Sequence, residues 1–284
     1  MLVRLDVYRN FATRAGNDDA FAHLTHRGYL VKGLSARQRV QCALTHYRFE
    51  ELTFNESYRR EVYLEGGMSL WQHESSRARF AIKLAMAPRF IGEGELMLSL
   101  LADGKRLHCM AFNWIEGSMV GLPCAVIPLV VRNQGRTNGL EGVFAAFEAE
   151  FPHSSPSFFC FAALQGLAQA LGMTTVVGVK STFHIHSDRC DSKHLSNAYD
   201  GFWKKLGGTE LPGSVWRIEL PFYQAPLQHI VSRHRKRAKQ RRTFWEDINA
   251  SARDIVQGTL ARANAAEEFL GLVSDTGSFA RSRG

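Results

Sequence analysis

The chain has 284 residues, of which 45% are hydrophobic and 22% are charged, with a formal net charge of +8. These proportions are those of a globular protein and exclude extensive disorder. No run of 18 consecutive apolar residues predicts a membrane-spanning helix. Seven of the positive charges fall in SRHRKRAKQRR at residues 232–242, without an acidic residue, and without them the net charge falls to +1. The sequence therefore describes a nearly neutral body with one strongly basic segment.

The five cysteines are an odd number and include no C-x-x-C pair. This pattern favours free thiols in a reducing compartment over a disulfide framework. The first ten residues, MLVRLDVYRN, lack the apolar core of a secretion signal. We therefore expect a cytoplasmic protein.

Residues 18–85 have a mainly helical pattern. The clearest segment is 34–54, where apolar residues such as Val40, Leu44 and Tyr47 fall roughly on one face. Ser35 is placed to act as the N-cap of this helix.

Strands are predicted from Arg79 onward. The stretch GEGELMLSLLADGKRLHCMAFNWIEG at 92–117 indicates two strands joined by a turn at Asp103 and Gly104. The apolar run at 122–135, LPCAVIPLVVRNQG, is typical of a strand buried on both faces.

Helices and strands alternate after this strand. Helices are expected at 139–151 and 155–172, the second starting at Ser155 and Pro156 and ending at Gly172. A strand at 173–181, a helix at 194–208 and a strand at 214–222 follow, and then the basic segment as a further helix. The order predicts a mixed α/β sheet, with a helical region at 1–78, an α/β core at 79–225 and a basic helical extension at 226–284.

Two motifs in this core resemble those of GNAT-type acyltransferases. VVRNQGRTNG places Arg132 and Gly135 as in the R/Q-x-x-G-x-G/A loop of that superfamily, although Thr137 stands where Gly or Ala is usual. FWKKLGG at 202–208 is similar to the end of its last helix. The resemblance implies a twisted mixed sheet of GNAT type. It also implies that backbone and side chains of the loop hold the pyrophosphate or phosphopantetheine of a thioester donor, through Arg132, Gln134, Gly135, Arg136 and Thr137.

A wider resemblance covers residues 44–248. GEGELMLSLL, the NQG after the buried strand, NAYDGFWKKLGG and SRHRKRAKQRRTFWEDI together resemble the VirK/YbjX family of largely uncharacterised bacterial proteins. That family is linked in broad terms to envelope integrity, virulence and resistance to cationic peptides.

The acid of an acyl transfer would come from a tyrosine. Trp203 stands where the GNAT resemblance implies that Tyr, and an indole N–H is no acid near neutral pH. Tyr199 lies one turn earlier on the same helix face and can replace it. Trp203 is then expected to contact substrate.

Two segments offer a base. Glu93 and Glu95 would share one face of a strand, and we prefer Glu95 as the base, the alternative being that both carboxylates are solvated at the start of the strand. HIHSD supplies His184, expected to contact substrate, and His186, a second candidate base; the alternative is a solvated loop. A third interpretation has His186 and Asp188 begin a non-haem iron site completed by His229 or His234, but we expect no metal.

The basic segment indicates an anionic partner. Its cations are Arg233, Arg235, Lys236, Arg237, Lys239, Arg241 and Arg242. An acidic acyl carrier protein, nucleic acid as second choice and a membrane surface are the candidate partners, and a solvated helix face is the alternative.

The leading hypothesis is a GNAT-like acyltransferase that moves an acyl group from acyl-CoA or an acyl carrier protein thioester to an amine or hydroxyl. A non-catalytic protein that binds nucleic acid or anionic lipid through the basic helix is the main alternative, and an iron oxygenase is the third.

Overall fold

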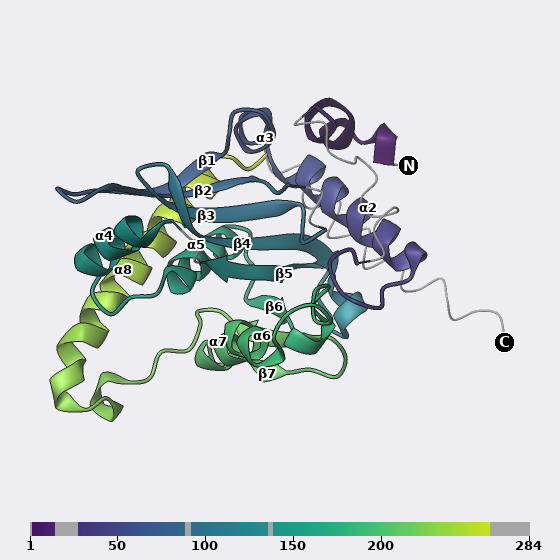
Figure 1. Cartoon of the computed structure of the whole chain (residues 1–284). Coiled ribbons are helices and arrows are strands. Elements are labelled where there is room, and N and C mark those ends of the chain that lie inside the picture. The colour runs from purple at the N-terminus through teal and green to yellow at the C-terminus, as the bar shows by residue number, and fades with distance from the viewer. Residues whose placement is uncertain (1, 15–27, 89–91, 136–138, 262–284) are drawn as a thin grey trace.

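One eight-stranded sheet organises the protein (Figure 1). The structure, a computed structural model, describes residues 2–14, 28–88, 92–135 and 139–261. The strand order is β1-β2-β3-β4-β5-β6-β8-β7, and all neighbours are antiparallel except β5 and β6. The strands are β1 (Met68–Glu74), β2 (Arg79–Met86), β3 (Leu96–Ala102), β4 (Lys105–Glu116), β5 (Val126–Gly135), β6 (Thr175–Val179), β7 (Thr209–Glu210) and β8 (Val215–Glu219). The predicted α/β class with a mixed sheet is confirmed.

Helices precede the sheet and cover it. The longer ones are α2 (Ala36–Thr53), α3 (Glu56–Tyr63), α4 (Glu141–Glu150), α5 (Pro156–Ala170), α6 (Ser192–Ala198), α7 (Asp200–Lys205) and α8 (Ser232–Gln257). Short helical turns are η1 (Leu2–Arg4), η2 (Val7–Ala12), η4 (Gly117–Val120), η5 (Ser181–Phe183) and η6 (Leu227–His229). No described helix combines the length and apolar character that crossing a membrane requires.

The N-terminal third is less helical than predicted. Ser35 caps α2 as expected, in a capping box in which its hydroxyl accepts the Gln38 N–H and the Gln38 side chain accepts the Ser35 N–H. The prediction of a mainly helical pattern as far as residue 85 is wrong from residue 68 onward, because β1 occupies 68–74 and β2 occupies 79–86; the start of strands at Arg79 is confirmed by β2. β1 lies at the edge of the sheet, where its polar outer half, from Gln72 to Glu74, needs no apolar alternation.

The turn at Asp103 and Gly104 is confirmed. Both residues have positive φ, 48° and 75°, as a two-residue hairpin between β3 and β4 requires.

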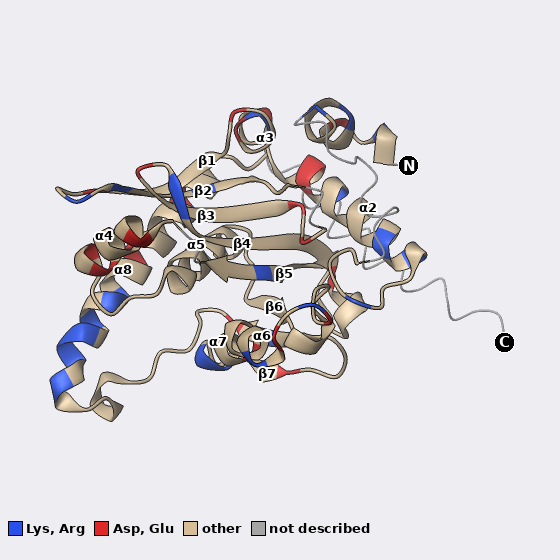
Figure 2. Cartoon of the chain, viewed as in Figure 1, with Lys and Arg blue, Asp and Glu red and all other residues tan. Residues whose placement is uncertain are grey.

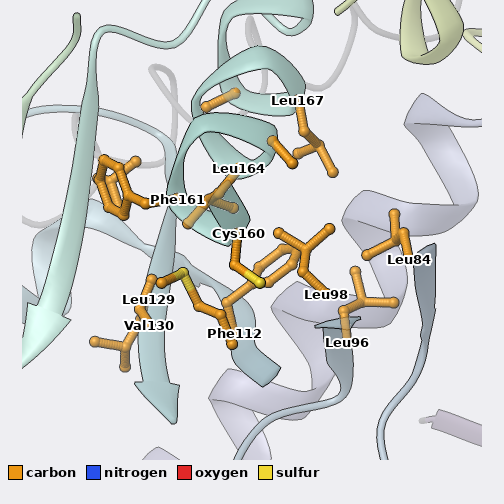
Figure 3. Packing of buried hydrophobic residues seen from close by; sticks show 14 of the residues in the cluster. Leu84, Leu96, Leu98, Phe112, Leu129, Val130, Cys160, Phe161, Leu164 and Leu167 are labelled. Atoms are coloured by element: carbon orange, nitrogen blue, oxygen red, sulfur yellow. The ribbon is translucent and has the colours of Figure 1, made fainter. Parts of the chain in front are cut away.

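The core lies between the sheet and α5. Phe112 of β4 and Leu98 of β3 face Cys160 and Leu164 of α5 (Figure 3). The α5 helix begins after Ser155 and ends before Gly172, as predicted. Its other side packs on α8, where a Cβ at Gly166 would come within 2.3 Å of the Asn249 carbonyl oxygen. Only glycine allows this close approach.

The predicted helix at 194–208 is two helices. Tyr199, with φ −111° and ψ −77°, interrupts it between α6 and α7. The predicted end of the helix at the glycine pair is confirmed, because Gly207 has a φ of 80°, the left-handed conformation that ends helices.

The predicted C-terminal extension, residues 226–284, is bonded to the sheet through α8. In the second half of α8, Asp247 accepts the Trp71 indole N–H (2.7 Å) and the Ser251 hydroxyl donates to the Leu70 carbonyl (2.8 Å). α8 ends at Gln257, and the rest of the predicted extension, residues 262–284, lies outside the described residues.

Candidate functional site

The sheet opens between β5 and β6. These parallel strands pair only at Leu129–Val177 and Val130–Gly178, whereas β5 continues to Gly135 alongside β4 alone. Beyond Val130, the edge of β5 therefore has no described strand beside it. The opening is a place where backbone donors must find other partners.

Tyr199 fills this opening. Its hydroxyl accepts the backbone N–H of Asn133 at 3.2 Å, and the Asn133 side chain donates to the Ala198 carbonyl at 2.8 Å. The break between α6 and α7 thus turns Tyr199 toward the free edge of β5. Burial raises the pKa of Tyr199, so the phenol keeps its proton.

His184 connects Tyr199 to a buried carboxylate. Its Nε2 lies 2.9 Å from the Tyr199 hydroxyl and 2.9 Å from Glu93 Oε1. The second contact lacks hydrogen-bond alignment, and Glu93 Oε1 accepts no hydrogen bond from a described residue. Burial, together with the charge of Arg132, lowers the pKa of His184 from 6.5 to about 4, so its imidazole is neutral at neutral pH.

Glu93 is fully buried and forms an ion pair with Arg132 through its other oxygen. The preceding and following glycines make this placement feasible. Gly94 has a φ of 97°, and a Cβ there would come within 2.9 Å of the Phe112 carbonyl oxygen on β4. The GEG segment therefore crosses tightly over β4 and brings Glu93 to β5.

Three irregular segments meet at this point. The Leu30 N–H donates to the Gly92 carbonyl (2.8 Å), and the Lys32 N–H donates to the Phe183 carbonyl (2.9 Å). Arg132, Gln134 and His186 are half-buried, while Glu93, His184 and Tyr199 are buried. Solvent therefore reaches the edge of the cluster and not its centre.

Arg132 lies on the sheet face opposite α5. It pairs with Ala111, which alternates with the α5-facing Phe112, and its Nε donates to the Cys109 sulfur at 3.3 Å. Burial raises the pKa of Cys109, so this cysteine is a thiol and not a ready nucleophile.

Glu95 is not the solvated carboxylate of a strand entry. It lies in the irregular segment before β3, 3% exposed, and accepts hydrogen bonds from the hydroxyls of Tyr29 (2.7 Å) and Tyr47. Both oxygens are engaged, so the structure separates Glu95 from the cluster around Tyr199 and puts Glu93 there instead.

His186 is at the solvent edge of the cluster. Burial and the neighbouring His184 and Arg132 lower its pKa, which keeps the imidazole neutral. Asp188 forms an ion pair with Lys32 at 2.6 Å. Within the described ranges, no group of three His, Cys, Asp or Glu side chains is arranged to hold a metal ion.

The predicted donor loop is largely strand. Arg132, Gln134 and Gly135 belong to β5, because β4 continues far enough to pair with all three. Gly135 packs on His108, whose Nδ1 would lie 2.6 Å from an added Cβ. Arg136 and Thr137 lie outside the described residues.

Trp203 is a core residue. Its ring covers Gly178, where an added Cβ would lie 2.4 Å from the indole, and its N–H donates to the Val179 carbonyl at 2.9 Å. These contacts give Trp203 a packing role in the core, and the expected contact with substrate stays a prediction.

Sequence reasoning missed Asn133 and ranked Glu93 below Glu95. The available signal for Glu93 was its position between two glycines. The seven cations of α8 lie apart from this cluster, at the start of the helix (Figure 2).

Comparison with protein-family models assigns the chain to a family. Residues 9–254 match the family described as "Protein of unknown function (DUF535)", and the chain belongs to this family. No curated protein and no solved structure matches it.

Proposed function

We propose that this protein is cytoplasmic, that it is of the VirK/YbjX kind, and that it is a GNAT-like acyltransferase that uses an acyl-CoA or acyl carrier protein thioester. The observation that carries the proposal is the Tyr199 hydroxyl, held in the opening between β5 and β6 by the Asn133 N–H and by His184 Nε2. The single parallel pair and its β5-α4-α5-β6 crossover support the same reading.

The opening suits a thioester. A donor that enters along the free edge of β5 has to displace the Tyr199 hydroxyl from the Asn133 N–H, which can then stabilise negative charge on the carbonyl oxygen. Tyr199 stands next to this N–H with its proton in place, ready for the sulfur as the C–S bond breaks. The strand edge and the phenol therefore act on the two ends of the same carbonyl–sulfur unit.

His186 is the base in this scheme. The acceptor nitrogen or oxygen bonds to the carbonyl carbon, its proton passes to the neutral imidazole, and the thiolate takes the proton of Tyr199. His184 Nε2 accepts a hydrogen bond from the Tyr199 hydroxyl. The Glu93–Arg132 ion pair lies against His184 and holds it in position. Glu95, which two tyrosines hold, has no part in the transfer.

Native mass spectrometry with acetyl-, butyryl- and palmitoyl-CoA, and with an acylated carrier protein, tests donor binding. We expect a one-to-one complex with at least one donor. Failure of every donor to bind would contradict the proposal.

A thiol-release assay with a mixture of amine acceptors tests the acid. Tyr199→Phe should retain the complex and lower the rate by about 100-fold or more, the usual size of an acid–base contribution. Tyr63→Phe is the matched control, since Tyr63 is also buried but donates to Glu50, away from the opening. Equal rates for the two variants would remove Tyr199 from the reaction.

A further inference from the structure

The start of α8, residues 232–242, is strongly basic, and we call this segment the arm. Residues 232–237 are all exposed, and Ala238 is the first buried residue of the helix. The cations number seven between residues 233 and 242, and the first acidic residue of α8 is Glu246. In the part of the chain that the structure describes, none of the seven forms an ion pair.

The charges surround the helix. At 3.6 residues per turn, Arg233, Lys236, Arg237 and Arg241 lie on one side, and Arg235, Lys239 and Arg242 on the opposite side. A helix that lies in a membrane interface needs an apolar face, and a protein interface needs an apolar centre. The arm has neither, because its one apolar residue, Ala238, is already buried.

A second basic element, Lys204 and Lys205, lies near the C-terminal end of the arm. Arg242 donates to the Ala225 carbonyl, in the segment that leads from β8 to α8. In the same segment the Tyr223 N–H donates to the Leu206 carbonyl (2.9 Å), directly after the exposed Lys204 and Lys205. Tyr223 is itself 58% exposed, so positive charge and an aromatic side chain continue from the arm onto the body.

We propose that the arm binds duplex DNA through its phosphates, without sequence preference. The major groove of B-DNA is about 12 Å wide and admits an α-helix, with phosphates on both sides of it. A helix with cations on both sides fits this arrangement, whereas the major groove of duplex RNA is too narrow for side chains to read. The interaction is separate from the acyl transfer, since no residue of the arm belongs to the Tyr199 cluster.

Fluorescence anisotropy with a labelled 24-base-pair DNA duplex, in 50–300 mM KCl, tests the proposal. We expect the affinity to fall at least about 100-fold between 50 and 200 mM salt, as the release of several counterions requires. The combined variant Lys236→Gln, Arg237→Gln and Lys239→Gln should weaken binding at least tenfold at 50 mM. It should also reduce the slope of log K against log salt by up to about 3.

The matched control neutralises three exposed cations elsewhere, Arg37→Gln, Lys105→Gln and Arg106→Gln, and should bind within twofold of the unmodified protein. Circular dichroism verifies that both variants keep their helices. Equal loss in both variants, or no DNA binding at 50 mM salt, would overturn the proposal. Arm-dependent binding to phosphatidylglycerol vesicles or to duplex RNA in preference to DNA would also overturn it.

Discussion

Glu93 and Glu50 are both completely buried, and the protein accommodates the two carboxylates in different ways. Glu93, beside β5, has the cation of Arg132 against one oxygen and the imidazole of His184 near the other. Its charge is therefore compensated by another charge.

Glu50, on α2, has neutral donors. The Trp114 indole N–H (2.6 Å) and the Tyr58 hydroxyl (3.2 Å) donate to Oε1, and the Tyr63 hydroxyl donates to Oε2 (3.1 Å). Burial raises the pKa of Glu50 from 4.5 to about 7, although these bonds and the charge of Arg59 act in the opposite direction.

The difference shows how a cation decides what a buried carboxylate does. Desolvation penalises the charged form in both regions. An arginine makes Glu93 part of an ion pair in the candidate site, while hydroxyls and an indole leave Glu50 able to take up a proton near neutrality. Removing the cation of Arg132 should therefore lower the free energy of unfolding more than removing a hydroxyl that donates to Glu50.

The largest effect is expected from Arg132→Ala. The substitution leaves the Glu93 carboxylate buried without its cation, which should lower the free energy of unfolding by about 3–5 kcal/mol. Urea unfolding at pH 7.5 measures this loss. Sequence reasoning placed Arg132 in donor binding alone, and the ion pair adds a structural role.

A double variant separates the buried charge from other causes. Arg132→Met together with Glu93→Gln removes both charges and should recover at least half of the lost stability. A loss below about 1 kcal/mol for Arg132→Ala would show that Glu93 has another compensating partner.

An intermediate effect is expected from Glu50→Gln, and it depends on pH. Between about pH 4.5 and 7 the folded protein holds a proton on Glu50 that the unfolded chain has released. The stability from this group therefore falls as the pH rises through that range, and it is constant above it. Gln does not titrate; its carbonyl oxygen accepts as the acid's oxygen does, and its amide group donates in place of the O–H of the protonated acid.

The measurement is urea unfolding of both proteins at pH 5 and pH 8. Relative to the unmodified protein, Glu50→Gln should gain roughly 2.5 kcal/mol between these values, at about 1.4 kcal/mol per pKa unit. His108 and His184, whose pKa values burial lowers to about 4, change stability in the opposite sense between about pH 4 and 6.5. They do so in both proteins and cancel in the difference. Parallel pH profiles would contradict the titration of Glu50.

The smallest effect is expected from Tyr58→Phe. The hydroxyl is one of two donors to Glu50 Oε1, and Phe preserves the stacking on Phe54 at 3.8 Å between ring centroids. A loss of about 1 kcal/mol at pH 6 is expected for one hydrogen bond. A loss near that of Arg132→Ala would mean that the hydroxyl matters as much as a cation.

Local signals in the sequence were reliable where a few neighbouring residues decide the structure. The capping box at Ser35, the Asp103–Gly104 turn and the Pro156 start of α5 all depend on contacts within one turn of chain. The edge strand β1 was missed because its pairing with β2, and not its own pattern, makes it a strand.

The site was predictable only in part. His184, His186, Tyr199 and Arg132 were singled out from the sequence, and the structure brings them together. Their partner Glu93 was ranked below Glu95 because two glutamates two residues apart look equivalent in a sequence. Their environments differ through residues far away in the chain: Arg132 for Glu93, and Tyr29 and Tyr47 for Glu95.

The sequence by itself determined the α/β class, most helices and strands, the hairpin and the basic segment, because periodicity, caps and charge runs are properties of neighbouring residues. Only the tertiary structure decided that β5 and β6 separate after two residue pairs, that Tyr199 turns into the opening, and that Glu93 meets Arg132. These features depend on contacts 39 to 66 residues apart, and such contacts form only when the whole sheet is assembled.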